Sequence, residues 1–177
     1  MATQPVFDKP VSIEEYLAME FEHDCEFVDG VIEERDMGEF DHAYTQGILI
    51  GIFLKNREKW DVYPLPEQRV QTQARHFRIP DVSILREGSK REPILTRPPL
   101  IAIEVQSPDI PLRKTAIKAD EYRAFGIEHV WVIDPYARVG YVGTGSGLEL
   151  LRSGEFSVPG TPIRIVLTEL FAELDRV

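Results

Sequence analysis

The sequence predicts an α/β fold of the α+β kind, in which helices flank a mixed β-sheet. Two observations support this prediction. The predicted elements follow the order helix, hairpin, helix, strands, helix, strands, which argues against a doubly wound parallel sheet. Residues 100–105 also form an almost continuous apolar run, which is typical of a central strand covered on both faces. The 177 residues suit one domain, which we expect to span 1–177.

The first quarter of the chain predicts a short helix followed by a β-hairpin. Ser12 and Glu15 have the spacing of a capping box, so a helix is expected over residues 12–19. Two strand-like runs follow, at 25–28 and 31–34. The Asp29-Gly30 pair between them is typical of a tight hairpin turn.

A longer helix is expected next, with Asp41 placed to cap it. Its apolar residues recur at the spacing of a buried helix face: Ile48, Leu49, Ile52 and Phe53. Residues 68–74 and 78–85 then predict a second hairpin pair. The polar, proline-containing segment 86–99 predicts a loop before the apolar strand at 100–105.

The second half of the chain predicts one helix followed by several strands. Residues 113–125 have helical character, and Gly126 is placed to end that helix. Residues 129–133 predict another buried strand, which Asp134-Pro135 would stop. A meander over 138–142 and 148–151, a strand-like segment at 161–167 and a short terminal helix complete the prediction.

Charge and cysteine content limit the classes of function. The formal net charge of −10 counts against a protein that coats nucleic acid by bulk electrostatics. It leaves nucleic acid open as a substrate, because a bound divalent cation inverts the local field. The single cysteine, Cys25, rules out an intramolecular disulfide and favours a cytoplasmic compartment. We expect no signal peptide, and the apolar stretches are shorter than a membrane span.

Glu104 is the acidic residue that fits its surroundings least well. It interrupts the apolar run Leu100-Ile101-Ala102-Ile103-Glu104-Val105. An unpaired carboxylate in a central strand costs several kcal/mol, so Glu104 must be protonated, find a cationic partner or bind a metal. The competing acids have simpler explanations: Glu33 and Glu34 suit a solvated hairpin end, and Asp134 suits a turn.

Two more acids are candidates for a buried site. Glu26 lies in a strand whose two faces both look apolar, although an edge-strand glutamate in solvent explains it equally well. Asp81 follows Pro80, which holds the chain extended and places Asp81 near a strand start. A turn or capping role explains Asp81 better when its position is taken alone.

Such acids have a chemistry in common. Carboxylates from two strands and a nearby third can bind Mg²⁺ or Mn²⁺ through oxygen atoms. The metal can then lower the pKa of a bound water and stabilise charge on a phosphate. A neighbouring lysine adds a donor to the developing anion.

Three segments carry a family resemblance: 26–30 (EFVDG), 79–82 (IPDV) and 103–108 (IEVQSP). Together they resemble the PD-(D/E)XK nuclease pattern. With Tyr122 ahead of residues 129–135 (HVWVIDP), the chain resembles the Uma-type "putative restriction endonuclease" family over roughly 13–142. The resemblance implies a restriction-endonuclease-like core.

The resemblance also implies roles for individual residues. Asp81 and Glu104 match the metal ligands, and Glu26 matches the acid contributed earlier in the chain. The pattern expects lysine two residues after the second acid, where this chain has Gln106. Glutamine can orient a water or a phosphate oxygen but carries no charge.

A replacement for that lysine can come from the helix that follows. Lys114, Lys118 and Tyr122 share one helix face, and Lys118 matches the family's helical lysine. A solvated lysine is the competing interpretation. His42 matches a family histidine and could hydrogen-bond Glu26 or act near the water, although a structural role is at least as good an explanation.

Three functions therefore stay open, of which hydrolysis of another phosphate ester is the weakest, since the metal chemistry does not itself specify DNA. The first is a Mg²⁺- or Mn²⁺-dependent endonuclease that cleaves DNA, in which Glu26, Asp81, Glu104, Gln106 and Lys118 form the catalytic set. Asp81 and Glu104 would hold the metal, and Glu26 would complete the metal shell or position a water. Homodimer formation would suit the cutting of two strands. The second is a non-catalytic module that keeps the nuclease fold for protein interaction or oligomerisation, as the absent motif lysine and the net charge suggest.

Overall fold

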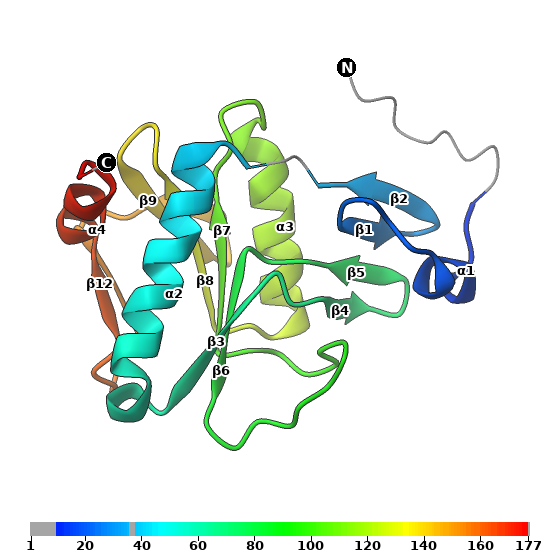
Figure 1. Cartoon of the computed structure of the whole chain (residues 1–177), viewed down its shortest axis with the longest axis horizontal. Coiled ribbons are helices and arrows are strands. Elements are labelled where there is room, and N and C mark those ends of the chain that lie inside the picture. Colours follow the sequence, from blue (N-terminus) through cyan, green and yellow to red (C-terminus); the bar gives the residue numbers. More distant parts are fainter. Residues whose placement is uncertain (1–9, 36–37, 177) are drawn as a thin grey trace.

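The computed structural model describes residues 10–35 and 38–176, so nearly all of the segment on which the signal-peptide prediction rests lies outside the described residues. Two main β-sheets organise these residues (Figure 1). The larger sheet has the strand order β10-β9-β8-β7-β6-β3. Its strands are β3 (Val62–Pro66), β6 (Val82–Arg86), β7 (Ile101–Val105), β8 (His129–Asp134), β9 (Val139–Thr144) and β10 (Gly147–Leu150).

The smaller sheet has the order β2-β1-β5-β4 and lies beside the larger one (Figure 1). Its strands are β1 (Cys25–Val28), β2 (Val31–Glu34), β4 (Val70–Gln73) and β5 (His76–Arg78). A separate two-stranded ladder joins β11 (Glu155–Ser157) to β12 (Arg164–Val166). The helices are α1 (Ile13–Ala18), α2 (Phe40–Trp60), α3 (Leu112–Phe125) and α4 (Leu167–Leu174).

The larger sheet is mixed, as the sequence predicts. Strands β7 and β8 are parallel and are joined by α3, whereas every other neighbouring pair in this sheet is antiparallel. A parallel pair needs a crossover of this kind, because its two strands begin at the same edge. Within the described stretches, no helix is both long and apolar enough to cross a membrane.

The two faces of the larger sheet are covered by different helices. Leu49 and Phe53 of α2, together with α4, pack on the face that carries Ile101 and Ile103. On the other face, Ala102 packs with Ala119 of α3. These contacts follow from the alternation of side chains along β7 and place α3 next to every second residue of that strand.

Several local predictions are confirmed. The Ser12 hydroxyl accepts from the Glu15 N–H and the Glu15 carboxylate accepts from the Ser12 N–H, which completes the capping box of α1. Gly126 ends α3 in the left-handed region, with φ of 105°. The carboxylate of Asp134 accepts from the N–H groups of Tyr136 and Ala137, so this acid has the predicted turn role.

Two local predictions are wrong. Asp41 does not cap α2, because the helix begins at Phe40 and its N-cap residue is Glu39. The predicted hairpin of 68–74 with 78–85 is not formed either. Strand β4 pairs with β5, whereas β6 enters the larger sheet. The Ile79-Pro80-Asp81 segment separates β5 from β6, because proline has no N–H to continue a ladder.

Candidate active site

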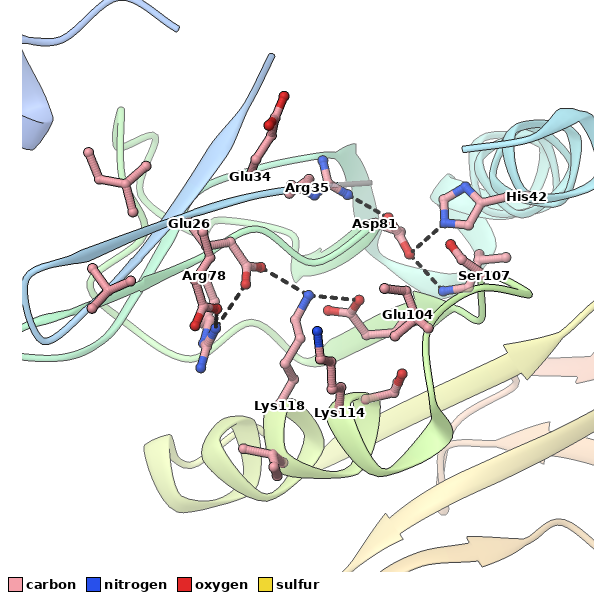
Figure 2. A pocket seen from close by; sticks show the side chains of 17 residues that line it. Glu26, Glu34, Arg35, His42, Arg78, Asp81, Glu104, Ser107, Lys114 and Lys118 are labelled. Atoms are coloured by element: carbon pink, nitrogen blue, oxygen red, sulfur yellow. Dashed lines mark hydrogen bonds and ion pairs between the residues drawn. The ribbon is translucent and has the colours of Figure 1, made fainter. Parts of the chain in front are cut away.

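A cavity of about 490 Å³ lies at the junction of the two sheets. Residues from β1, β2, β7, the start of α2 and the first half of α3 line it (Figure 2). The lining includes Glu26, His42, Asp81, Glu104 and Lys118. The cavity therefore brings together five of the six residues that the sequence singles out.

Glu104 lies at the centre of this arrangement. It belongs to β7, whose five residues are all buried, and only 6% of its surface is exposed. Its side chain faces α3, from which the Tyr122 hydroxyl donates to Oε1 at 2.6 Å and Lys118 Nζ approaches Oε2 at 3.1 Å. The prediction that Glu104 is buried and must find a partner is thereby confirmed.

Asp81 is positioned by the pairing of β6 with β7. Val82 lies opposite Ile103 in this antiparallel pair, so Asp81 falls beside Glu104. The Val105 N–H donates to Asp81 Oδ2 at 2.7 Å, which ties the carboxylate to the backbone next to Glu104. Asp81 is 2% exposed and is therefore not a solvated turn residue.

Glu26 reaches the cavity from the smaller sheet. Its strand, β1, lies between β2 and β5, so the edge-strand interpretation is wrong. Glu26 is 4% exposed, and both of its carboxylate oxygens have partners. Oε1 accepts from the Ile79 N–H at 2.9 Å, and Oε2 accepts from Arg78 at 2.9 Å.

Lys118 joins the acids of the two sheets. Its Nζ lies 2.9 Å from Glu26 Oε1 and 3.1 Å from Glu104 Oε2 (Figure 2). The predicted helix face is present, since Lys114 also lines the cavity and Tyr122 lies buried behind it. Lys118 is therefore not an ordinary solvated lysine, because its ammonium group is shared between two buried carboxylates.

Gln106 does not line the cavity. Its amide donates to the carbonyls of Ser107 and Ile110, and its carbonyl accepts from the Thr115 hydroxyl. These bonds attach the loop after β7 to the first turn of α3. In this arrangement Gln106 positions the helix that carries Lys118.

His42 lines the cavity but has a different partner from the one expected. Its Nε2 lies 3.3 Å from Asp81 Oδ2, and the partners of Glu26 are Arg78, Lys118 and the Ile79 N–H. The expected bond from His42 to Glu26 is therefore wrong. The reason is that His42 lies in the first turn of α2, which packs on β6 and β7 and so brings it to Asp81.

The three carboxylates differ in electrostatic state. Burial alone would raise the pKa of Glu26, but Lys118, Arg78 and the Ile79 N–H together lower it. Burial also opposes ionisation of Asp81, yet His42 and Arg35 hold its pKa below the ordinary value. The pKa of Glu104 is raised by burial, which Lys118 only partly offsets, and by the charges of Asp81 and Glu26.

The donor chemistry fits a hard divalent cation held by few ligands. Among the described residues, no group of three or more His, Cys, Asp or Glu side chains is placed to hold a metal ion. Asp81 and Glu104 nevertheless offer oxygen donors from neighbouring strands to the same cavity. Mg²⁺ often uses only one or two carboxylates and keeps several waters, so this pair suffices.

Sequence reasoning missed two arginines and one acid at the site. Arg35 pairs with Asp81, and Arg78 bridges Glu26 and Glu121. Arg78 lies between Phe77 and Ile79, so it is a charged residue within an apolar segment, which is the same signal that identifies Glu104. Arg35 follows two acids at a hairpin end and gives no such signal.

Comparisons with known proteins concern the family and the fold of the chain. Residues 13–146 match the sequence profile of the Uma2 family, described as "Putative restriction endonuclease". The fold is similar to the crystal structure of a protein from Anabaena variabilis described as a putative nuclease belonging to DUF820. That likeness has a TM-score of 0.79 and 21% identity and covers 93% of this chain and 99% of the other. No curated protein matches the sequence.

Proposed function

Because the chain belongs to the Uma2 family of "putative restriction endonucleases", we propose that it is a metal-dependent endonuclease that hydrolyses phosphodiester bonds in DNA. One observation carries the proposal. Three buried carboxylates, of Glu26, Asp81 and Glu104, line one cavity together with the ammonium group of Lys118. Buried ionisable groups with perturbed pKa values cluster at functional sites, and this cluster lines a cavity.

Asp81 and Glu104 would hold Mg²⁺ or Mn²⁺. The bound metal would supply a water of lowered pKa and stabilise negative charge on the phosphate. Glu104 suits this role because its carboxylate lies in a region already crowded with negative charge, which a cation would relieve. The Val105 N–H fixes the orientation of Asp81, so the two ligands are positioned before any metal binds.

Lys118 takes the role that the motif assigns to a lysine at position 106. Its Nζ lies between Glu26 and Glu104 and can donate to a phosphate oxygen or to the attacking water. Glu26 would hold this ammonium group in place and complete the metal shell or position a water, since its carboxylate lines the same cavity. Gln106 contributes by anchoring the start of α3.

DNA is the substrate we propose, in the cytoplasm. The cavity lining mixes four cationic side chains, those of Arg35, Arg78, Lys114 and Lys118, with five acids, so a bound divalent cation would turn its field toward a phosphate positive. A two-fold homodimer would present one such cavity to each strand of a duplex.

The proposal is tested by cleavage of plasmid and single-stranded DNA with Mg²⁺ or Mn²⁺. We expect cleavage by the wild-type protein, a loss of at least about 100-fold in the Glu104→Ala variant, and no cleavage in EDTA. Glu149→Ala is the matched control, because Glu149 is an exposed acid on β10 whose side chain accepts from the Thr144 and Ser146 hydroxyls, away from the cavity. Thermal unfolding of both variants checks that they fold.

A specific observation also favours the non-catalytic alternative. Each of the three carboxylates already has at least one cationic partner, so the cluster is stable without a metal. If calorimetry shows no Mn²⁺ binding and no nucleic acid is cut, the endonuclease proposal is wrong and the non-catalytic module is the better description.

A further inference from the structure

The carboxylate of Asp81 has no free oxygen. Arg35 Nη2 lies 2.5 Å from Oδ1, while Oδ2 accepts from the Val105 N–H at 2.7 Å and lies 3.3 Å from His42 Nε2. Figure 2 shows Arg35 and His42 reaching Asp81 from opposite sides. These partners use three of the roughly four lone pairs of a carboxylate, so a divalent cation would reach Asp81 most readily at Oδ1, directly beside the Arg35 guanidinium.

The three partners differ in how easily they can leave. The Val105 N–H belongs to a central strand and cannot move without breaking the sheet. His42 has a short side chain fixed to the first turn of the 21-residue helix α2. Arg35 follows the last residue of β2, and its backbone N–H donates to the Asp24 carbonyl at 3.3 Å. Its long side chain can therefore swing while its backbone stays in place.

The second anchor of Arg35 is weak. Its Nη1 lies 3.1 Å from Glu67 Oε1, and the Glu67 side chain is 47% exposed. Pairs with exposed carboxylates contribute little, because water competes for both groups. Arg35 is thus held in place mainly by Asp81, the acid that the metal would need.

We propose that Arg35 occupies the cation position at Asp81 when no metal is bound and moves to the substrate phosphate when a metal takes its place. This inference rests on the proposed function. A divalent cation on Oδ1 would lie directly beside the Arg35 guanidinium, where their like charges repel strongly. Arg35 also lines the cavity, so the released side chain stays beside the place where the phosphate would bind.

The chemistry of the guanidinium suits its second position. Arginine presents planar donors that match two oxygens of one phosphate, whereas lysine acts as a point charge. A phosphate in the cavity would thus attract Arg35 away from Asp81 and favour metal binding. Metal and substrate would then bind with positive coupling, because the metal releases Arg35 toward the phosphate and the phosphate draws Arg35 away from Asp81.

The test compares Mn²⁺ binding by two variants in the absence of DNA. In R35Q the competitor for Asp81 is gone, so we expect Mn²⁺ to bind at least about fivefold more tightly than to the wild type, by titration calorimetry. K114Q is the matched control. Lys114 lines the same cavity, but it forms no ion pair in the part of the chain that the structure describes. The K114Q substitution removes one unit of positive charge from the cavity, as R35Q does, but it leaves the ion pair between Arg35 and Asp81 in place.

A second readout separates competition from a merely structural role. Metal-free R35Q should melt at a lower temperature than the wild type, because Asp81 loses a buried partner. Saturating Mn²⁺ should raise the melting temperature of R35Q by more than that of the wild type. If R35Q loses stability and binds Mn²⁺ no better than K114Q does, the proposal for Arg35 is overturned.

The possible outcomes also distinguish this inference from the proposed function. If the wild type binds Mn²⁺ and cuts DNA while R35Q shows no gain over K114Q in Mn²⁺ affinity, only the role of Arg35 fails. If neither the wild type nor R35Q binds Mn²⁺, both proposals fail. A gain in Mn²⁺ affinity confined to R35Q supports the exchange of Arg35, whatever nucleic acid proves to be the substrate.

Discussion

The side chains on both faces of β7 are buried, but one face is apolar and the other is ionic. Ile101, Ile103 and Val105 point into the large apolar core beneath α2 and α4. Ala102 and Glu104 point to the other face, where α3 and the cavity meet. All five residues are buried, so the difference between the faces is not one of access to water.

This comparison shows two ways of stabilising a buried strand. On the apolar face, burial is favourable for each side chain on its own. One apolar residue can therefore be substituted by another of similar size at little cost. On the ionic face, burial of each charge is unfavourable until a particular partner arrives. The ionic face is therefore the more fragile one, and it is also the face that can respond to a metal or a phosphate.

Among the substitutions that disrupt the ionic cluster, removal of Arg78 is expected to destabilise the fold most. Its guanidinium pairs with Glu26 and Glu121, and all three residues are buried. We expect Arg78→Ala to lower the free energy of unfolding by about 3–5 kcal/mol, because two carboxylates lose their shared partner. Chemical denaturation measures this loss.

Arg176→Ala is the control for that experiment. Arg176 pairs with Glu173 on the surface, where 74% of the arginine side chain is exposed. Its removal should change the free energy of unfolding by less than about 0.5 kcal/mol. Equal losses in the two variants would show that burial does not set the strength of these pairs.

A smaller loss is expected from Glu121→Gln, and it should depend on pH. Burial opposes ionisation of Glu121, but its bonds from Arg78 and Thr72 lower its pKa below 4.5. A carboxylate with a lowered folded-state pKa stabilises the fold above its ordinary pKa, and this contribution disappears as the pH falls through the folded value. The gap between wild type and variant should be about 1.5–3 kcal/mol near pH 7.

The same gap should be smaller at about pH 3.5, which lies below the ordinary glutamate pKa of about 4.3, because the contribution of a carboxylate with a lowered folded-state pKa is lost as the pH falls. Denaturation at the two pH values measures both gaps. A gap that is unchanged between them would mean that Glu121 contributes through shape and packing and not through its charge.

The smallest effect is expected on the apolar face. Ile103 is fully buried in the large core, and Ile103→Val removes one methylene group. We expect a loss of about 0.5–1.5 kcal/mol with little change between pH 7 and pH 3.5, since no charge is involved. Mn²⁺ affinity should stay as in the wild type. A change in that affinity would show that packing on one face of β7 controls the site on the other.

Much of the site could be predicted, and the reasons differ between residues. Glu104 was identifiable because it breaks an apolar run, which is a local signal. Lys118 required the helix face and the family resemblance together. Asp81 looked more like a turn residue from its position, and only the pairing of β6 with β7 shows why it is buried. Arg35 follows two acids at a hairpin end and gives no local signal of burial.

The sequence by itself determined the elements and their buried faces. Strand alternation, helix spacing, capping residues and turn glycines act over a few residues, so their signals can be read locally. This is why α1, α3, the β1–β2 hairpin and the burial of Glu104 were predictable.

Only the tertiary structure decided which charges meet. The ion pairs of the site join residues between 14 and 92 positions apart, as in Lys118 with Glu104 and Lys118 with Glu26. No local pattern specifies such pairs, because each depends on how two sheets and a helix pack around one cavity. Glu104 was therefore predicted to need a partner, whereas the identity of its partners, and the arginine that covers Asp81, came from the fold.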